Sequence, residues 1–165
     1  MPEDSPRLFI DADACPVKEE VYRVGARYGF HTLVVANGRL NVPRSPLIEL
    51  KVVSGRFDAA DDWIVDQVTP EDIAITADIP LAARVLAKGA RALDPKGRVF
   101  SPDSIGDALA AREFSAFLRD MGEQGGGPPP FTPKDRSRFL QSLDTVIQSL
   151  LKARRARAPK PTEAP

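Results

Sequence analysis

Short apolar segments with the length and composition of buried strands alternate with helical segments over about the first 100 residues of the chain. Strands that alternate with helices in this way form a parallel sheet with helices on both of its faces. We therefore expect a three-layer, Rossmann-like α/β domain with a mainly parallel sheet in the strand order 3-2-1-4-5. The five expected strands are LFI (8–10), HTLVVA (31–36), IELKVV (48–53), DIAITA (72–77) and ARAL (90–93).

Beyond the last of these strands the pattern changes to helices alone. Ser101 and Pro102 are typical of a helix start, and Thr132 begins a second helix with Asp135 in a capping-box position. The stretch EQGGGPPPF between them cannot continue a helix, because glycine and proline dominate it. The predicted organisation is an α/β domain with its following helix over 6–121, a Gly/Pro linker over 122–132, a C-terminal helix over 133–155 and a disordered tail over 156–165.

The composition excludes several kinds of site. Lys and Arg total 23, and Asp and Glu also total 23, so the net charge does not indicate a nucleic-acid partner. Cys15 is the single cysteine, which excludes an intrachain disulfide and a cysteine-rich zinc site. No apolar run approaches the roughly 20 residues that cross a bilayer, and the charged N-terminus has no apolar signal core. We therefore expect a cytoplasmic protein without a membrane partner.

Acidic and amide side chains follow several of the predicted strands. In an open α/β sheet, ligands bind beyond the carboxyl ends of the strands, where the strand order reverses. For the order 3-2-1-4-5, that place lies between the first and the fourth strand. The polar residues expected at this edge are Asp11 and Asp13 after the first strand, Asn37 after the second, Asp58, Asp61 and Asp62 after the third, and Asp78 after the fourth.

Such a concentration of carboxylates predicts a metal site. Crowded carboxylates repel one another, so they either take up protons or share a cation. Oxygen ligands without a cluster of His or Cys suit Mg²⁺ or Mn²⁺ better than Zn²⁺. If the backbone stays extended through residue 13, Asp11 and Asp13 lie on the same side roughly 6–7 Å apart at Cα and can share one ion. Metal-assisted phosphodiester hydrolysis is the chemistry that such a site serves.

Several of these residues also have a structural interpretation. Asp58 and Asp78 stand where helices begin, so each can cap a helix, and Asp61 can interact with a helix dipole. Asp11 is harder to explain in this way, because the end of a strand at the reversal point is a poor place for an idle carboxylate. Cys15 is interpreted as a small buried residue, since the neighbouring carboxylates oppose formation of a thiolate.

Basic residues beside the same edge can hold the phosphates of a nucleic acid. Arg39 and Arg44 belong to the loop after the second strand, and Arg56 and Arg84 are expected close to the same edge of the sheet. The C-terminal stretch from Lys152 to Lys160 is also basic, which fits either phosphate binding or a solvated helix end.

Five stretches of the chain carry a resemblance to known proteins. They are DADACPVKEEVYRVGARYG, VVANGRLNVP, GRFDAADDWIV, ITADIPLAARVLAKGA and PKGRVFSPDSI. They closely resemble the YaiI/YqxD family of bacterial proteins, whose function is unassigned. Together with the later GGGPPPFTPKDRSRFLQSLD, the resemblance covers about residues 7 to 150. One step further out, the family looks like a member of the PIN-like/NYN-like superfamily, which includes metal-dependent ribonucleases.

The resemblance to PIN-like nucleases also implies roles for individual residues. Asp11 would correspond to their first-strand aspartate, Asp78 to the acidic residue after the fourth strand, and Asp58 or Asp61 to the one on the intervening helix. The chain departs from many such nucleases because it lacks a further acidic cluster after the fourth strand. Two residues would be auxiliary, Asp13 and Asn37.

Three functions fit these observations. The first is a Mg²⁺- or Mn²⁺-dependent endonuclease acting on RNA, with Asp11, Asp61 and Asp78 as metal ligands and Asp13 and Asp58 orienting waters. The second is a non-catalytic module that binds RNA or another protein. The third is a phosphatase, because the DAD sequence also resembles the start of haloacid dehalogenases. In that case Asp11 would be the nucleophile and Asp13 the general acid.

Overall fold

A six-stranded sheet forms the centre of the molecule in a computed structural model that describes residues 5–13, 15–55, 58–122 and 129–157. The strand order is β3-β2-β1-β4-β5-β6, which confirms the predicted α/β class and the order 3-2-1-4-5. The first five strands are parallel, and β6 pairs antiparallel with β5. The strands are β1 (Arg7–Asp11), β2 (His31–Ala36), β3 (Ile48–Val52), β4 (Ile73–Ile75), β5 (Arg91–Leu93) and β6 (Val99–Phe100).

The sequence analysis did not predict β6, which is too short to carry a periodic signal. A tight turn places it beside β5, because the Asp94 carboxylate accepts the backbone N–H groups of Lys96 and Arg98 at 3.0 and 2.8 Å. Gly97 lies in the same turn with a φ of 91°, a left-handed conformation that glycine adopts without strain.

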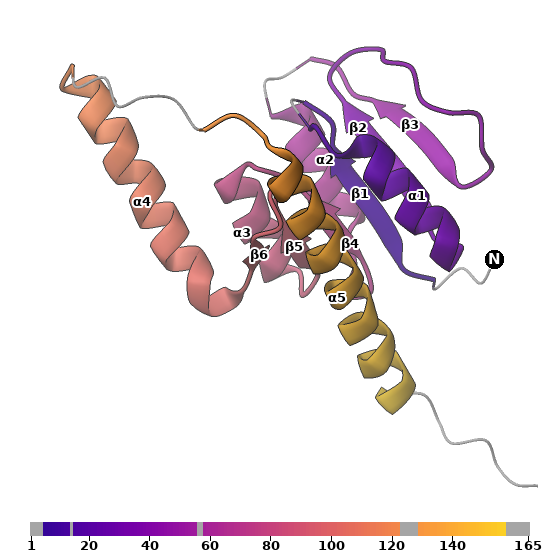
Figure 1. The fold of residues 1–165 in the computed structure, drawn as a ribbon. Coiled ribbons are helices and arrows are strands. Elements are labelled where there is room, and N and C mark those ends of the chain that lie inside the picture. Colours follow the sequence, from indigo (N-terminus) through magenta and orange to yellow (C-terminus); the bar gives the residue numbers. More distant parts are fainter. Residues whose placement is uncertain (1–4, 14, 56–57, 123–128, 158–165) are drawn as a thin grey trace, which may run out of the picture.

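Helices cover both faces of the sheet, as the three-layer prediction requires (Figure 1). One face is packed by α1 and α5, and the opposite face by α2 and α3. Along β1 the side chains alternate between the two layers, because Leu8 and Ile10 belong to the first core and Phe9 to the second. The helices are α1 (Lys18–Tyr28), α2 (Ala59–Gln67), α3 (Ile79–Ala87), α4 (Pro102–Asp120) and α5 (Pro133–Arg157).

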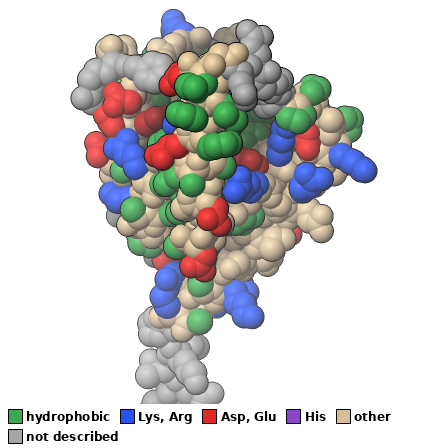
Figure 2. Space-filling view, turned by 90° about the vertical axis from the view of Figure 1, so that its left-hand side faces the viewer, with side chains coloured by type: hydrophobic (Ala, Val, Ile, Leu, Met, Phe, Trp, Pro, Cys, Tyr) green, Lys and Arg blue, Asp and Glu red, His purple; other side chains and the backbone are tan. Residues whose placement is uncertain are grey.

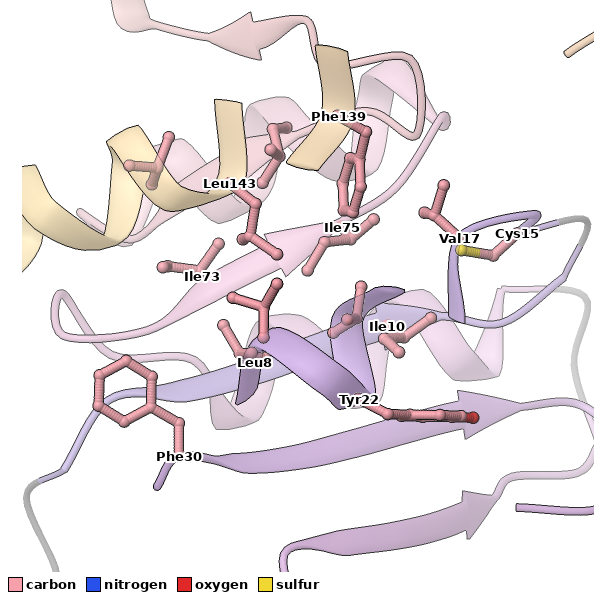
Figure 3. Packing of buried hydrophobic residues seen from close by; sticks show 14 of the residues in the cluster. Leu8, Ile10, Cys15, Val17, Tyr22, Phe30, Ile73, Ile75, Phe139 and Leu143 are labelled. Atoms are coloured by element: carbon pink, nitrogen blue, oxygen red, sulfur yellow. The ribbon is translucent and has the colours of Figure 1, made fainter. Parts of the chain in front are cut away.

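The C-terminal helix α5 is part of the α/β core. Its fully buried Phe139 and Leu143 belong to the same apolar cluster as Ile73 and Ile75 of β4, and Figure 3 shows the helix lying across that strand. An ion pair between Arg136 Nε and Oε1 of the buried Glu20, 3.2 Å apart, joins it to α1. The predicted linker and tail fall partly on residues 123–128 and 158–165, which lie outside the described residues.

The helix α4 is the least buried element of the fold. It packs mainly on α3 and buries only Ala108. The side chains of Phe114, Phe117 and Met121 are 61%, 57% and 68% exposed, respectively. Figure 2, which views the molecule from the side where α4 lies, shows hydrophobic side chains gathered there at the surface. The capping predicted at Ser101 is present, since Ser101 and Ser104 each accept the other's backbone N–H.

The second predicted helix start is also confirmed. The backbone N–H of Thr132 donates to Asp135 Oδ2 at 2.9 Å, and the backbone N–H of Asp135 donates to Thr132 Oγ1 at 3.2 Å. None of the helices that the structure describes is long and apolar enough to cross a membrane.

Candidate functional site

The strand order reverses at the edge formed by the carboxyl ends of β1 and β4. These strands are parallel neighbours with Ile10 level with Ile75, so Asp11 and Thr76 lie side by side. The Thr76 hydroxyl donates to Asp11 Oδ2 at 2.8 Å, and the Asp78 backbone N–H donates to Thr76 Oγ1 at 3.0 Å. Because Thr76 is buried, it holds the Asp11 carboxylate firmly against the start of α3.

Asp78 is both a helix cap and a member of this edge. Its Oδ1 accepts the backbone N–H of Leu81 at 3.0 Å, which confirms the capping interpretation. The cap orients the carboxylate, and its charge raises the pKa values of both Asp11 and Asp61. Asp78 therefore lies close enough to both carboxylates to repel them.

Asp61 is the third carboxylate at this edge, and its pKa is strongly raised. It lies in the first turn of α2 and is half-buried. Burial, followed by repulsion from Asp78 and Asp11, raises the pKa of Asp61 from 3.8 to about 6, with Arg84 acting in the opposite direction. The fold thus brings together carboxylates from β1, α2 and the start of α3, which are far apart in the sequence.

Burial is also the main reason why the pKa of Asp11 is raised. Repulsion from Asp13 and Asp78 adds to the rise, whereas the hydrogen bond from Thr76 opposes it. The carboxylates of Asp11, Asp61 and Asp78, with Asp13 beside them, are here called the acidic rim. A cation at this place would remove the repulsion that these shifts record.

The structure corrects the expected backbone between Asp11 and Asp13. The strand β1 ends at Asp11, and Asp13 lies in a turn in which the Cys15 backbone N–H donates to the Ala12 carbonyl. The extended backbone assumed for sharing one ion therefore does not continue to residue 13. Asp13 is instead exposed, and its Oδ2 accepts a 2.9 Å hydrogen bond from the side-chain amide of Asn37 at the end of β2.

Asp58 precedes α2 and is exposed, and its side chain makes no capping hydrogen bond to that helix. Its charge contributes to the raised pKa of Asp61, which places it beside the acidic rim. Arg84 is also close to this edge, because its Nη1 is 3.0 Å from Asp62 Oδ1. Arg39 and Arg44 are exposed in the loop between β2 and β3, and Arg56 lies outside the described residues.

Most of the chain matches a known family of sequences. A profile described as "Uncharacterized BCR, YaiI/YqxD family" matches residues 9–149. The chain belongs to the YaiI/YqxD family. A UPF0178 protein of Caulobacter vibrioides (strain NA1000 / CB15N) is 55% identical over 149 residues, which cover 90% of this chain and 95% of the relative. A UPF0178 protein of Rhodospirillum centenum is 53% identical over 151 residues, which cover 89% and 98%.

Among solved structures, the crystal structure of a mutant of Rae1 (YacP) from Bacillus subtilis has a distant likeness to this member of the YaiI/YqxD family. It is 12% identical with a TM-score of 0.38, over 90% of this chain and 99% of that chain. A TM-score this low supports no functional argument.

Within the described parts of this YaiI/YqxD chain, no three His, Cys, Asp or Glu side chains are already arranged to hold a metal ion. The acidic rim is therefore a set of neighbouring carboxylates and not a closed cage of ligands. Mg²⁺ rarely uses such a cage, since it keeps several waters and binds through one or two carboxylates together with substrate phosphates. The donor set of the acidic rim fits that mode of binding.

Sequence reasoning missed Thr76, the residue that joins Asp11 to the start of α3. Its position directly after β4 could have indicated it, because β4 is the predicted neighbour of β1. Cys15 is buried, which confirms its interpretation as a small buried residue, and burial raises the pKa of its thiol. In the basic C-terminal stretch, Arg154 and Arg157 form ion pairs with Glu71, at the opposite edge of the sheet from the acidic rim.

Proposed function

We propose that this protein is a Mg²⁺- or Mn²⁺-dependent phosphodiesterase that cleaves RNA internally, with the acidic rim as its active site. The observation that carries the proposal is the convergence of Asp11, Asp61 and Asp78 at the point where the strand order reverses. Ligands of open α/β sheets bind at this point. A carboxylate whose pKa is raised by burial and by its neighbours in such a place is a candidate for function.

The roles of the residues follow from their contacts. Asp11, Asp61 and Asp78 would hold the cation directly or through its bound waters, and Thr76 keeps Asp11 oriented through its 2.8 Å hydrogen bond. When bound, the cation would lower the pKa of a water and stabilise negative charge on the phosphate oxygens. The exposed Asp13 and Asp58 would orient waters at the mouth of the site.

The loop between β2 and β3 supports a polyanionic substrate. Arg39 and Arg44 lie on it, and Asn37 at its start contacts Asp13 of the acidic rim. Guanidinium groups bind phosphate oxygens through paired hydrogen bonds. A chain of phosphates can therefore be held beside the acidic rim while one of them meets the carboxylates.

Calorimetric titration of Mn²⁺ into the wild-type protein and into Asp11→Asn tests the proposal. Asp66→Asn is the matched control, because Asp66 is an exposed carboxylate on α2. We expect binding to the wild type and the control and loss of binding in Asp11→Asn. The wild type and the control should also cleave labelled single-stranded and structured RNA, whereas Asp11→Asn should not. Cleavage should stop when the metal is chelated.

Equal Mn²⁺ binding by Asp11→Asn and the wild type would exclude Asp11 as a ligand. Metal-dependent cleavage that survives in Asp11→Asn would overturn the proposed active site. RNA binding that persists in a chelator, without cleavage, would instead favour the non-catalytic binding module. Trapping of a phosphate analogue covalently on Asp11 would favour the phosphatase.

A further inference from the structure

The loop over residues 37–47 is the crossover connection between the parallel neighbours β2 and β3. It contains neither helix nor strand, and it holds Pro43 and Pro46, whose rings restrict the backbone. Its charged residues are Arg39 and Arg44, and no acidic residue lies within it. Loops at the carboxyl edge of a sheet commonly bind ligands. This positively charged loop starts at that edge with Asn37, which contacts Asp13, so it is a candidate binding segment.

A cavity of about 540 Å³ lies against this loop, lined by Arg39, Leu40, Asn41, Val42 and Leu50. Its volume is within the range of about 300–1,000 Å³ typical of small-molecule sites. Leu40, Val42 and Leu50 are partly buried and pack against the core on the α1 face, so they supply a fixed apolar surface. The side chains of Arg39 and Asn41 are exposed.

This lining has the chemistry of a nucleotide site. A nucleotide presents an anionic phosphate, a base edge with donors and acceptors, and apolar faces of base and sugar. Arg39 can bind the phosphate, and the Asn41 amide can donate to and accept from a base edge. The three aliphatic side chains can contact the base or sugar. None of the described residues that line the cavity is aromatic, so shape and hydrogen bonding, not stacking, would hold the base.

The loop that lines the cavity starts beside the acidic rim. Asn37, two residues before Arg39, donates its side-chain amide to Asp13 at 2.9 Å. A nucleic-acid strand with one phosphate at the acidic rim could therefore follow this loop from Asn37 and place another of its nucleotides in the cavity. A base that is paired and stacked in a duplex cannot enter a concave pocket, whereas an unpaired base can.

We propose that the cavity of Arg39, Leu40, Asn41, Val42 and Leu50 binds one unpaired nucleotide of a single-stranded nucleic acid, on the same strand as the phosphate held at the acidic rim. This inference rests on the proposed function, whose substrate it specifies as single-stranded. Arg39 binds the phosphate of that nucleotide, and Asn41 reads its base.

Fluorescence anisotropy with a labelled single-stranded RNA tests the cavity. All proteins carry Asp11→Asn, so that the strand stays intact whether or not the wild type cleaves it. Into this background we introduce Arg39→Ala, Asn41→Ala or Arg112→Ala. The last is the matched control, since Arg112 is an exposed arginine on α4.

Arg39→Ala should weaken binding by about tenfold and lower the slope of log affinity against log salt by about 0.7, the value for one lost phosphate contact on a single strand. Asn41→Ala should change the ranking of homopolymer strands while the salt slope stays the same. Arg112→Ala should change neither quantity. A duplex RNA of the same length should bind more weakly than the single strand and be insensitive to Asn41→Ala.

The inference is overturned if the RNA does not bind, if Arg39→Ala and Arg112→Ala weaken binding equally, or if Asn41→Ala leaves the ranking unchanged. These outcomes are separate from the fate of the proposed function. If RNA binding depends on Arg39 but the wild type shows no metal-dependent cleavage, the proposed nucleotide site would be supported and the proposed nuclease activity would be refuted. Cleavage that depends on Asp11 but not on Arg39 would retain the nuclease and reject the cavity.

Discussion

Replacing Asp61 by asparagine should stabilise the metal-free protein at neutral pH. The substitution keeps the size of the side chain and removes a charge that Asp78 and Asp11 repel. The folded state raises the pKa of Asp61 from 3.8 to about 6, so it binds the proton more tightly than the unfolded chain does. The free energy of unfolding therefore falls as the pH rises from about 4 to 6, and it stays low above that range.

The size of the effect follows from the pKa. Each pKa unit corresponds to about 1.36 kcal/mol, so the full rise would cost the folded state about 3 kcal/mol. Because Asp61 is only half-buried, solvent screening reduces this cost to about 1 kcal/mol. For a domain of this size, Asp61→Asn should raise the melting temperature by about 3 °C at pH 7.5.

Urea unfolding of both proteins in EDTA, at pH 4 and at pH 7.5, measures this difference. Asp66→Asn on the exposed side of α2 is the control and should change the free energy of unfolding by less than about 0.5 kcal/mol. Addition of Mg²⁺ at pH 7.5 should stabilise the wild type, because a ligand that binds only the folded state stabilises it. Mg²⁺ should stabilise Asp61→Asn less, so the difference in the free energy of unfolding between the two proteins should become smaller.

A loss of stability in Asp61→Asn at pH 7.5 would refute the electrostatic reasoning. So would a gain of equal size at pH 4 and pH 7.5, since the carboxylate is largely protonated in the folded state at the lower pH. If Mg²⁺ leaves the difference in the free energy of unfolding between the two proteins unchanged, only the assignment of Asp61 as a metal ligand would be refuted.

Three further predictions concern the packing of the fold, and urea or thermal unfolding tests each of them. Asp72→Ala should lower the free energy of unfolding by about 3 kcal/mol or more, because the buried carboxylate binds the side chain and the backbone N–H of Arg7. An equal loss in Asp66→Asn would contradict this reasoning. Phe139→Ala should lower the free energy of unfolding by about 3–5 kcal/mol, because Phe139 is fully buried, whereas the exposed Phe114→Ala should lower it by less than about 0.5 kcal/mol. Similar losses in the two variants would contradict the burial of α5. Gly97→Ala should cost more than about 1 kcal/mol, since the new Cβ would lie 2.8 Å from the α5 backbone at a φ of 91°, and a neutral result would argue against that contact.

The strand order and the composition of the acidic rim could be predicted from the sequence, because both depend on local patterns. Short apolar segments that alternate with helices allow few topologies, since parallel strands need crossover connections. That topology brings the ends of β1 and β4 to one edge, so Asp11 and Asp78 could be expected there before any distance was known. The helix starts at Ser101 and Thr132 were equally local, because capping depends on residues three positions apart.

The chemical state of the site was decided only by the tertiary structure. The bond from Thr76 to Asp11, the burial that raises the pKa of Asp61, and the turn that exposes Asp13 depend on how separate segments pack. The strand β6 and the cavity beside Arg39 also arise from such packing. Local sequence determines which conformations a segment prefers, whereas desolvation and repulsion depend on distances between residues far apart in the chain. Those distances exist only once the sheet has formed and the helices cover it.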